Sequence, residues 1–156
     1  MDDFAYLATQ FPEIPFIVIG GSAEIFSAAG ISIPKNLQII ESLKQDELKE
    51  YYYSSKVFCL FSLTEGMPNV LCEAMLCGCI PVGSAVNFIP EIIGNNGFIV
   101  RRKNGELLTE ALSKALAENP QMGNLASESI KKRFSIETRE KELVSLLHTI
   151  IPKKNE

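Results

Sequence analysis

The sequence is poor in features that would point to several common functions. It contains one histidine, His148, far from the cysteines, and no paired CxxC spacing of the kind found in zinc sites. Its apolar stretches are short, and none approaches the ~20 residues that a membrane-spanning helix needs. The amino terminus, Met1-Asp2-Asp3, is acidic, so we expect no secretory signal peptide there. A net charge of −4 argues against a general nucleic-acid-binding surface.

Two common glycine-rich nucleotide motifs are also missing. Gly20-Gly21-Ser22 does not have the GxGxxG spacing of dinucleotide sites, and no GxxxxGK(S/T) P-loop occurs. The sequence therefore excludes dinucleotide-binding and P-loop functions.

The basic run Arg101-Arg102-Lys103 could contact a phosphate, but such clusters are usually solvated, and we favour a solvent-exposed loop.

The four cysteines, Cys59, Cys72, Cys77 and Cys79, all lie in apolar segments. Free cysteine commonly packs as a small hydrophobic residue, and the sequence places no further metal ligand near these four. We expect reduced thiols in the core of a cytoplasmic protein, and no bound metal. His148 falls near the end of a terminal helix, where we expect it at the surface.

Short β-branched runs alternate with helical patterns, and residues 1–156 show no repeat or linker, so we expect one domain. Strands are expected at 16–19, 37–40, 57–61, 80–82 and 98–100. Helices are expected near 4–11, 25–29, 48–52, 70–77 and 108–116, and two more after 120, with a turn near Pro90. Short apolar strands that alternate with helices indicate a parallel sheet covered on both faces, a three-layer α/β/α Rossmann-like fold.

In such sheets, ligands bind beyond the carboxyl ends of the strands, at helix N-termini. The loop after the third strand leads into an apolar helix, with Asn69 as its expected N-cap. Glu73 is the single acid on this helix, four residues after Asn69, so its carboxylate leans back toward the mouth of the loop. A buried carboxylate is costly unless a partner satisfies it, which makes Glu73 a candidate binding residue.

The chemistry of this loop suits a nucleotide. A carboxylate repels phosphate but accepts hydrogen bonds from ribose hydroxyls, whereas free N–H groups at a helix start favour a diphosphate. Gly66 allows close backbone approach, and Pro68 stiffens the turn into the helix. Two alternatives stay open: Glu73 pairs with a buried Lys or Arg, and Glu65 is an ordinary surface acid.

The segment EGMPNVLCEAM, residues 65–75, places Glu65 and Glu73 seven residues apart, and CGCIPV follows at 77–82. It resembles the E-x7-E signature of the retaining family-4 (group 1) glycosyltransferases. The likeness extends to IPEII at 89–93, NGFIV at 96–100 and Phe134-Ser135, and it covers nearly the whole chain from Phe16 onward.

The resemblance implies the C-terminal, donor-binding half of a GT-B fold, and transfer of a sugar from a nucleoside-diphosphate sugar to a glycan or lipid-linked saccharide. Glu65 would be the catalytic residue beside the donor sugar, and Glu73 would hold the ribose. The backbone of the intervening segment would contact sugar and diphosphate: Gly66, Met67, Pro68, Asn69, Val70 and Leu71. Such enzymes need no cofactor or bound metal. Their role in polysaccharide biosynthesis leaves peripheral membrane association of a full-length enzyme open.

The chain departs from the family pattern at its N-terminal edge. The family's donor domain usually opens with one more strand and with an Arg and a Lys that grip the diphosphate, whereas this chain starts inside the following helix. We therefore expect about five strands, one fewer than the family's six, and a missing N-terminal acceptor domain as partner. Glu41 and Asn87-Phe88 stand where the family often has glycine.

We therefore predict that the isolated chain is an inactive fragment of a glycosyltransferase. A non-catalytic nucleotide-binding or interaction module with the same fold is the alternative, and a natural start at Met1 would favour it. A glycosidase that uses Glu65 and Glu73 as acid and nucleophile fits the resemblance poorly.

Overall fold

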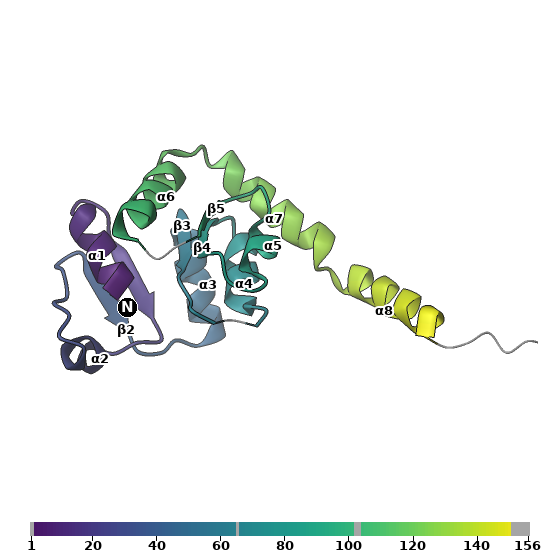
Figure 1. Cartoon of the computed structure of the whole chain (residues 1–156), viewed down its shortest axis with the longest axis horizontal. Coiled ribbons are helices and arrows are strands. Elements are labelled where there is room, and N and C mark those ends of the chain that lie inside the picture. Colours follow the sequence, from purple (N-terminus) through teal and green to yellow (C-terminus); the bar gives the residue numbers. More distant parts are fainter. Residues whose placement is uncertain (1, 65, 102–103, 151–156) are drawn as a thin grey trace, which may run out of the picture.

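The computed structural model describes residues 2–64, 66–101 and 104–150. In these ranges helices and strands alternate along the chain, as the sequence predicts (Figure 1). The strands are β1 (Phe16–Ile19), β2 (Leu37–Ile40), β3 (Val57–Leu60), β4 (Ile80–Ser84) and β5 (Phe98–Val100). The helices are α1 (Asp2–Gln10), α2 (Ala23–Ala28), α3 (Gln45–Ser54), α4 (Asn69–Leu76), α5 (Ile89–Ile93), α6 (Gly105–Ala117), α7 (Gln121–Arg133) and α8 (Ile136–Ile150).

Every strand pairing in the described residues is parallel, which confirms the α/β prediction. The strands nevertheless form two sheets rather than one: β1 pairs with β2, and β3, β4 and β5 form a second sheet in that order. The expected number of strands is confirmed, but a single continuous sheet is not. All residues of β1 and β3 line one cavity, so the two sheets face each other across it.

Helices cover both faces of the strands, in the predicted three layers. One core cluster lies between the strands and helices α1 and α6, and includes Leu7, Phe16, Val82 and Leu112. On the opposite face, α4, α5 and α7 enclose a second cluster around Leu71, while α3 and α4 hold a third around Tyr52, Ala74 and Cys79. Burial of these apolar side chains, at about 1.5–3 kcal/mol for each large one, is the main stabilising term.

Two local predictions are wrong. Asn69 is the first helical residue of α4, and Pro68 takes the N-cap position without a side-chain hydrogen bond. Residues 89–93, predicted as a turn around Pro90, form the short helix α5. Proline lacks the N–H that a first helical turn leaves unused, so Pro90 fits at the helix start.

The predicted core packing of the thiols is confirmed in full only for Cys79. Cys79 is buried, whereas Cys59, Cys72 and Cys77 are half-buried, and all are free of disulfides. The Cys79 thiol donates to the carbonyl oxygen of Tyr52 at 3.1 Å, and burial raises the pKa of both Cys79 and Cys59 to about 12. The described part of the chain holds no cluster of three or more histidine, cysteine, aspartate or glutamate side chains suited to a metal ion.

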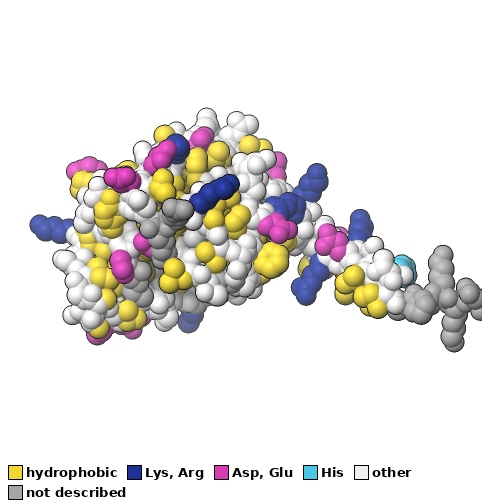
Figure 2. All heavy atoms as spheres, viewed as in Figure 1, with side chains coloured by type: hydrophobic (Ala, Val, Ile, Leu, Met, Phe, Trp, Pro, Cys, Tyr) yellow, Lys and Arg dark blue, Asp and Glu magenta, His cyan; other side chains and the backbone are white. Residues whose placement is uncertain are grey.

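The last helix, α8, contains no buried residue and extends away from the other elements (Figure 1). Its hydrophobic side chains form part of the exposed surface, and His148 is exposed as predicted (Figure 2). Among the described residues, none of the helices combines the length and apolar character that crossing a membrane requires.

Candidate functional site

The candidate site lies at the carboxyl edge of the strands, in the loops after β3 and β4. A buried serine joins these two loops: the hydroxyl of Ser84 accepts from the amide of Ser62 at 3.1 Å and donates to its carbonyl at 2.9 Å. The amide of Ala85 in turn donates to the carbonyl of Val100 at 3.0 Å, which ties the end of β5 to the same edge. The loop that carries the predicted site thus starts from a fixed backbone position.

The predicted donor-binding segment 66–71 connects this loop to α4. Gly66, Met67, Asn69 and Val70 are exposed, whereas Pro68 and Leu71 are buried and fix the helix against the core. The first amides of an α-helix have no intrahelical partner, and they carry the positive end of its dipole. The start of α4 is therefore an open position where an anionic group can be bound.

Glu73 lies one turn into α4 and is half-buried. Burial, together with the negative charge of Glu73, raises the pKa of Tyr52 to about 12, which places the carboxylate within electrostatic reach of α3. The ion pairs within the described ranges join Lys49 to Asp46 and Lys114 to Glu110, and neither includes Glu73. The structural ion pair that would explain Glu73 without a ligand is therefore absent from the described residues.

Some predicted residues cannot be placed. Glu65, the predicted catalytic residue, lies outside the described residues, as do Arg102 and Lys103 of the basic run. Arg101 is exposed, in agreement with a solvated loop. The distance between Glu65 and Glu73 thus stays a prediction.

Large apolar side chains are exposed in the loops after β3 and β4 and at the start of α4. Leu63, Met67 and Val70 are exposed from the loop after β3 and the first turn of α4, and Phe88 is exposed from the loop after β4. Exposed apolar side chains of this size are typical of surfaces that contact a ligand or another domain.

Sequence reasoning missed the role of one residue of this region, Ser84, and left the conformation of another, Asn87, undetermined. Ser84 fixes the loop after β3 through its two hydrogen bonds to Ser62. In the sequence, the only indication of this role is a polar residue at the end of an otherwise apolar strand. Asn87 adopts a positive φ of 47° in the loop before α5. Asparagine tolerates this left-handed conformation better than most residues, which explains how it serves where the family often has glycine.

The fold agrees with that of a known family. The family described as "Glycosyl transferases group 1" matches residues 2–133, so the chain belongs to that family. Its parallel α/β architecture is that of the Rossmann-like C-terminal domain of GT-B glycosyltransferases.

Curated relatives are longer than this chain. N-acetyl-alpha-D-glucosaminyl L-malate synthase of Bacillus anthracis is 28% identical over 94% of the chain, which spans 39% of that protein. An uncharacterized glycosyltransferase of Haemophilus influenzae is 30% identical over 74% of the chain, which spans 34% of its length.

Solved structures share the fold at low sequence identity. Sucrose-phosphate synthase of Thermosynechococcus elongatus superposes with a TM-score of 0.75 over 96% of this chain and 41% of its own, at 18% identity. The C-terminal domain of a group 1 glycosyl transferase from Francisella tularensis gives 0.70 over 86% of this chain and 79% of its own, also at 18% identity.

Proposed function

We propose that this chain is the nucleotide-sugar-binding part of a retaining glycosyltransferase. The nucleoside-diphosphate sugar would bind at the carboxyl edge, with its diphosphate at the start of α4 and its ribose on Glu73. The observation that carries this proposal is Glu73 itself, which is half-buried beneath an open helix start and has no ion-pair partner among the described residues.

The chemistry that this arrangement supports is electrostatic. Charge develops on the diphosphate as the bond to the sugar breaks, and preorganised N–H groups stabilise such charge. We propose that these groups act without a metal ion, and that Glu65 lies beside the donor sugar. The acceptor would be held by a second domain across the exposed apolar rim of Leu63, Met67 and Phe88.

Calorimetric titration of the chain with UDP, GDP and ADP in the presence of EDTA tests the binding step. We expect one of the three diphosphates to bind, and binding in EDTA would support independence from metal. Equal failure of all three nucleotides would overturn the proposal. Because the Bacillus anthracis relative is named for N-acetylglucosaminyl transfer, UDP-N-acetylglucosamine is the first sugar donor to compare with free UDP.

A further inference from the structure

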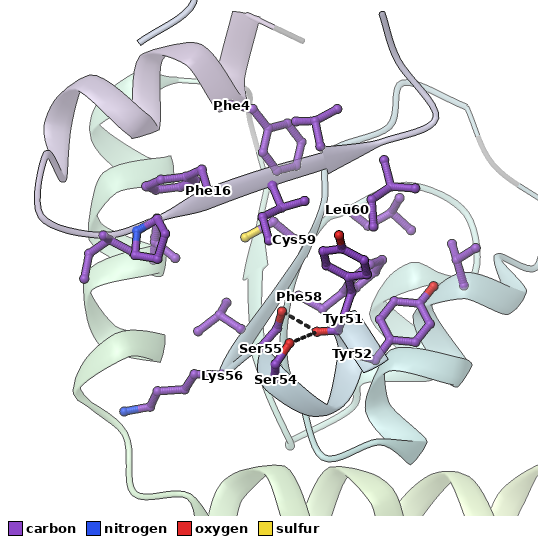
Figure 3. Close-up of a pocket in the computed structure, with 18 of the residues that line it drawn as sticks. Phe4, Phe16, Tyr51, Tyr52, Ser54, Ser55, Lys56, Phe58, Cys59 and Leu60 are labelled. Atoms are coloured by element: carbon purple, nitrogen blue, oxygen red, sulfur yellow. Dashed lines mark hydrogen bonds between the residues drawn. The ribbon is translucent and has the colours of Figure 1, made fainter. Parts of the chain in front are cut away.

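Glu73 lies on the side of α4 that faces α3. Cys77 packs against the cluster formed by Tyr52, Ala74 and Cys79, which α3 and α4 share. Glu73 precedes Cys77 by one helical turn and therefore lies on the same side of α4. Tyr52 projects from α3 (Figure 3), and burial together with the charge of Glu73 raises its pKa to about 12, in agreement with this placement.

The opposite side of α4 faces α5. Leu71 and Met75 of α4 pack with Ile89 and Ile92 of α5 in a second cluster. Each of the two α4 residues is two positions from Glu73, which places it about 200° around the helix from that carboxylate. Because α4 follows β3 and α5 follows β4, and these two strands pair in parallel, both helices start at the same carboxyl edge. Glu73 and the start of α5 thus lie on opposite sides of α4.

Phe88 occupies the N-cap position of α5, and its side chain is 55% exposed. Its carbonyl accepts from the amide of Ile92 at 2.9 Å, so its backbone belongs to the first turn of this helix. The next residue, Ile89, is fully buried. An aromatic ring therefore stands at the carboxyl edge on buried support, with apolar surface that a ligand can cover.

The helix that carries Phe88 is also held at its far end. The guanidinium of Arg133 donates to the carbonyls of Glu91 at 2.7 Å and Ile92 at 3.2 Å. Arg133 lies over the ring of Phe134, 4.9 Å from its centroid. Because both ends of this five-residue helix are bonded, the backbone of Phe88 has little freedom to lose when a ligand binds.

The groups of a nucleoside-diphosphate sugar follow one order: nucleoside, two phosphates, sugar. In the proposed function the ribose lies on Glu73, on the α3 side of α4, and the diphosphate lies at the helix start. The sugar is attached to the far phosphate, so it extends away from α3 and toward the start of α5. Packed helices lie about 8–10 Å apart, a span that a diphosphate with its attached sugar can cover.

We propose that the ring of Phe88 stacks against the sugar ring of the bound donor and makes the site selective for a pyranose. A pyranose carries C–H groups on its faces and hydroxyls around its edge, and such C–H groups pack on the electron-rich face of an aromatic ring. This inference rests on the proposed function, because the ribose on Glu73 sets the direction of the ligand. The contact adds affinity for the nucleotide sugar and none for the free diphosphate.

Calorimetry with three pairs of ligands tests this contact: UDP with UDP-N-acetylglucosamine, GDP with GDP-mannose, and ADP with ADP-glucose. Phe88→Leu keeps an apolar side chain but removes the ring, and it should weaken binding of the nucleotide sugar about 3- to 10-fold. Affinity for the matching diphosphate should be unchanged, which also shows that the variant is folded. Phe88→Tyr keeps the ring and should bind both ligands like the parent chain. Tyr53→Leu, which removes a ring 67% exposed on α3, is the matched control and should change neither affinity.

NMR of the bound nucleotide sugar gives a second readout. Protons held above an aromatic ring are shielded, so the sugar-ring protons should shift upfield on binding to the parent chain and to Phe88→Tyr, but not to Phe88→Leu. Unchanged sugar affinity and unchanged proton shifts in Phe88→Leu, with the diphosphate still bound, would overturn the role of Phe88 and leave the proposed function standing. An equal loss of sugar and diphosphate affinity would also overturn it. Failure of all three diphosphates to bind the parent chain would overturn the proposed function and this inference together.

Discussion

The hydroxyl of Ser84 bonds both the amide and the carbonyl of Ser62, so one buried side chain at the end of β4 holds the loop that follows β3. This loop leads directly to the start of α4, where we propose that the diphosphate binds. The position of the helix start thus depends on a residue that is outside the proposed site.

Ser84→Ala should therefore weaken both stability and nucleotide binding. It deprives both Ser62 backbone groups of a buried partner, at a cost of about 1–3 kcal/mol in the free energy of unfolding. Urea unfolding and calorimetry measure the two effects. Ser113→Ala, at an exposed position of α6, is the control and should change neither. If Ser84→Ala is destabilised but binds the nucleotide with unchanged affinity, the binding loop does not depend on the hydrogen bonds between Ser84 and Ser62.

The substitution Glu73→Gln distinguishes a nucleotide-binding role of Glu73 from a structural one. If Glu73 holds the ribose, the substitution should weaken nucleotide binding by about 1–3 kcal/mol, the cost of losing a charged hydrogen bond. It should leave the free energy of unfolding nearly unchanged, because the described residues offer Glu73 no ion-pair partner to lose. Glu128→Gln, exposed on α7, is the matched control. Strong destabilisation with unchanged affinity would instead indicate a structural role.

The sequence predicts the positions of the strands and helices better than the order of the strands and the contacts between elements. Strands such as 16–19 and 98–100 were predicted at their observed bounds, because each is a short apolar run between turn residues. The sequence analysis does not predict helix α5, whose contacts come in part from a distant residue: Arg133 of α7 donates to the carbonyls of Glu91 at 2.7 Å and Ile92 at 3.2 Å. A five-residue helix held by so distant a side chain leaves little local pattern.

The division into two sheets has a similar cause. Strand order depends on which edges meet in space, and the local pattern of β1 or β3 is the same whether or not a neighbour is present. In the site, the helix and Glu73 follow from spacing, whereas the bond between Ser84 and Ser62 joins residues 22 positions apart. Spacing within one segment cannot reveal such a contact.

The hydroxyl of Tyr52 should make stability sensitive to alkaline pH. Burial, with the charge of Glu73, raises its pKa from 10.0 to about 12. The folded state then binds this proton more tightly than the unfolded state, so the stabilisation is complete below pH 10 and is lost as pH rises from 10 to about 12.

Between about pH 8 and about pH 11, the free energy of unfolding of the parent chain should therefore fall by about 1 kcal/mol more than that of Tyr52→Phe. Urea unfolding at the two pH values measures the difference, and subtracting the two proteins removes the contribution of the thiols of Cys59 and Cys79. Tyr53→Phe, at an exposed position, should follow the parent chain. Identical pH profiles for all three proteins would show that Tyr52 ionises as readily when folded as when unfolded.

The chain alone should transfer no sugar. It spans 39% of the length of its Bacillus anthracis relative, and the family resemblance places the acceptor on a second domain. Holding donor and acceptor together can supply roughly 7–11 kcal/mol of a barrier, which one wall cannot provide. The Arg and Lys that the family resemblance places upstream would also counter charge on the diphosphate, and losing such a group costs ~100- to 1000-fold in rate.

A transfer assay with labelled nucleotide sugars compares three proteins: this chain, a form extended only by the opening strand that the family resemblance places upstream, and a form extended through the acceptor domain. We expect turnover from the last alone, while nucleotide binding is present in all three and strongest in the longest. The intermediate form is the informative control, because it adds the opening strand without the acceptor domain. Equal turnover by the short chain would place the chemistry within residues 1–156, and binding without turnover by the longest form would favour a non-catalytic module.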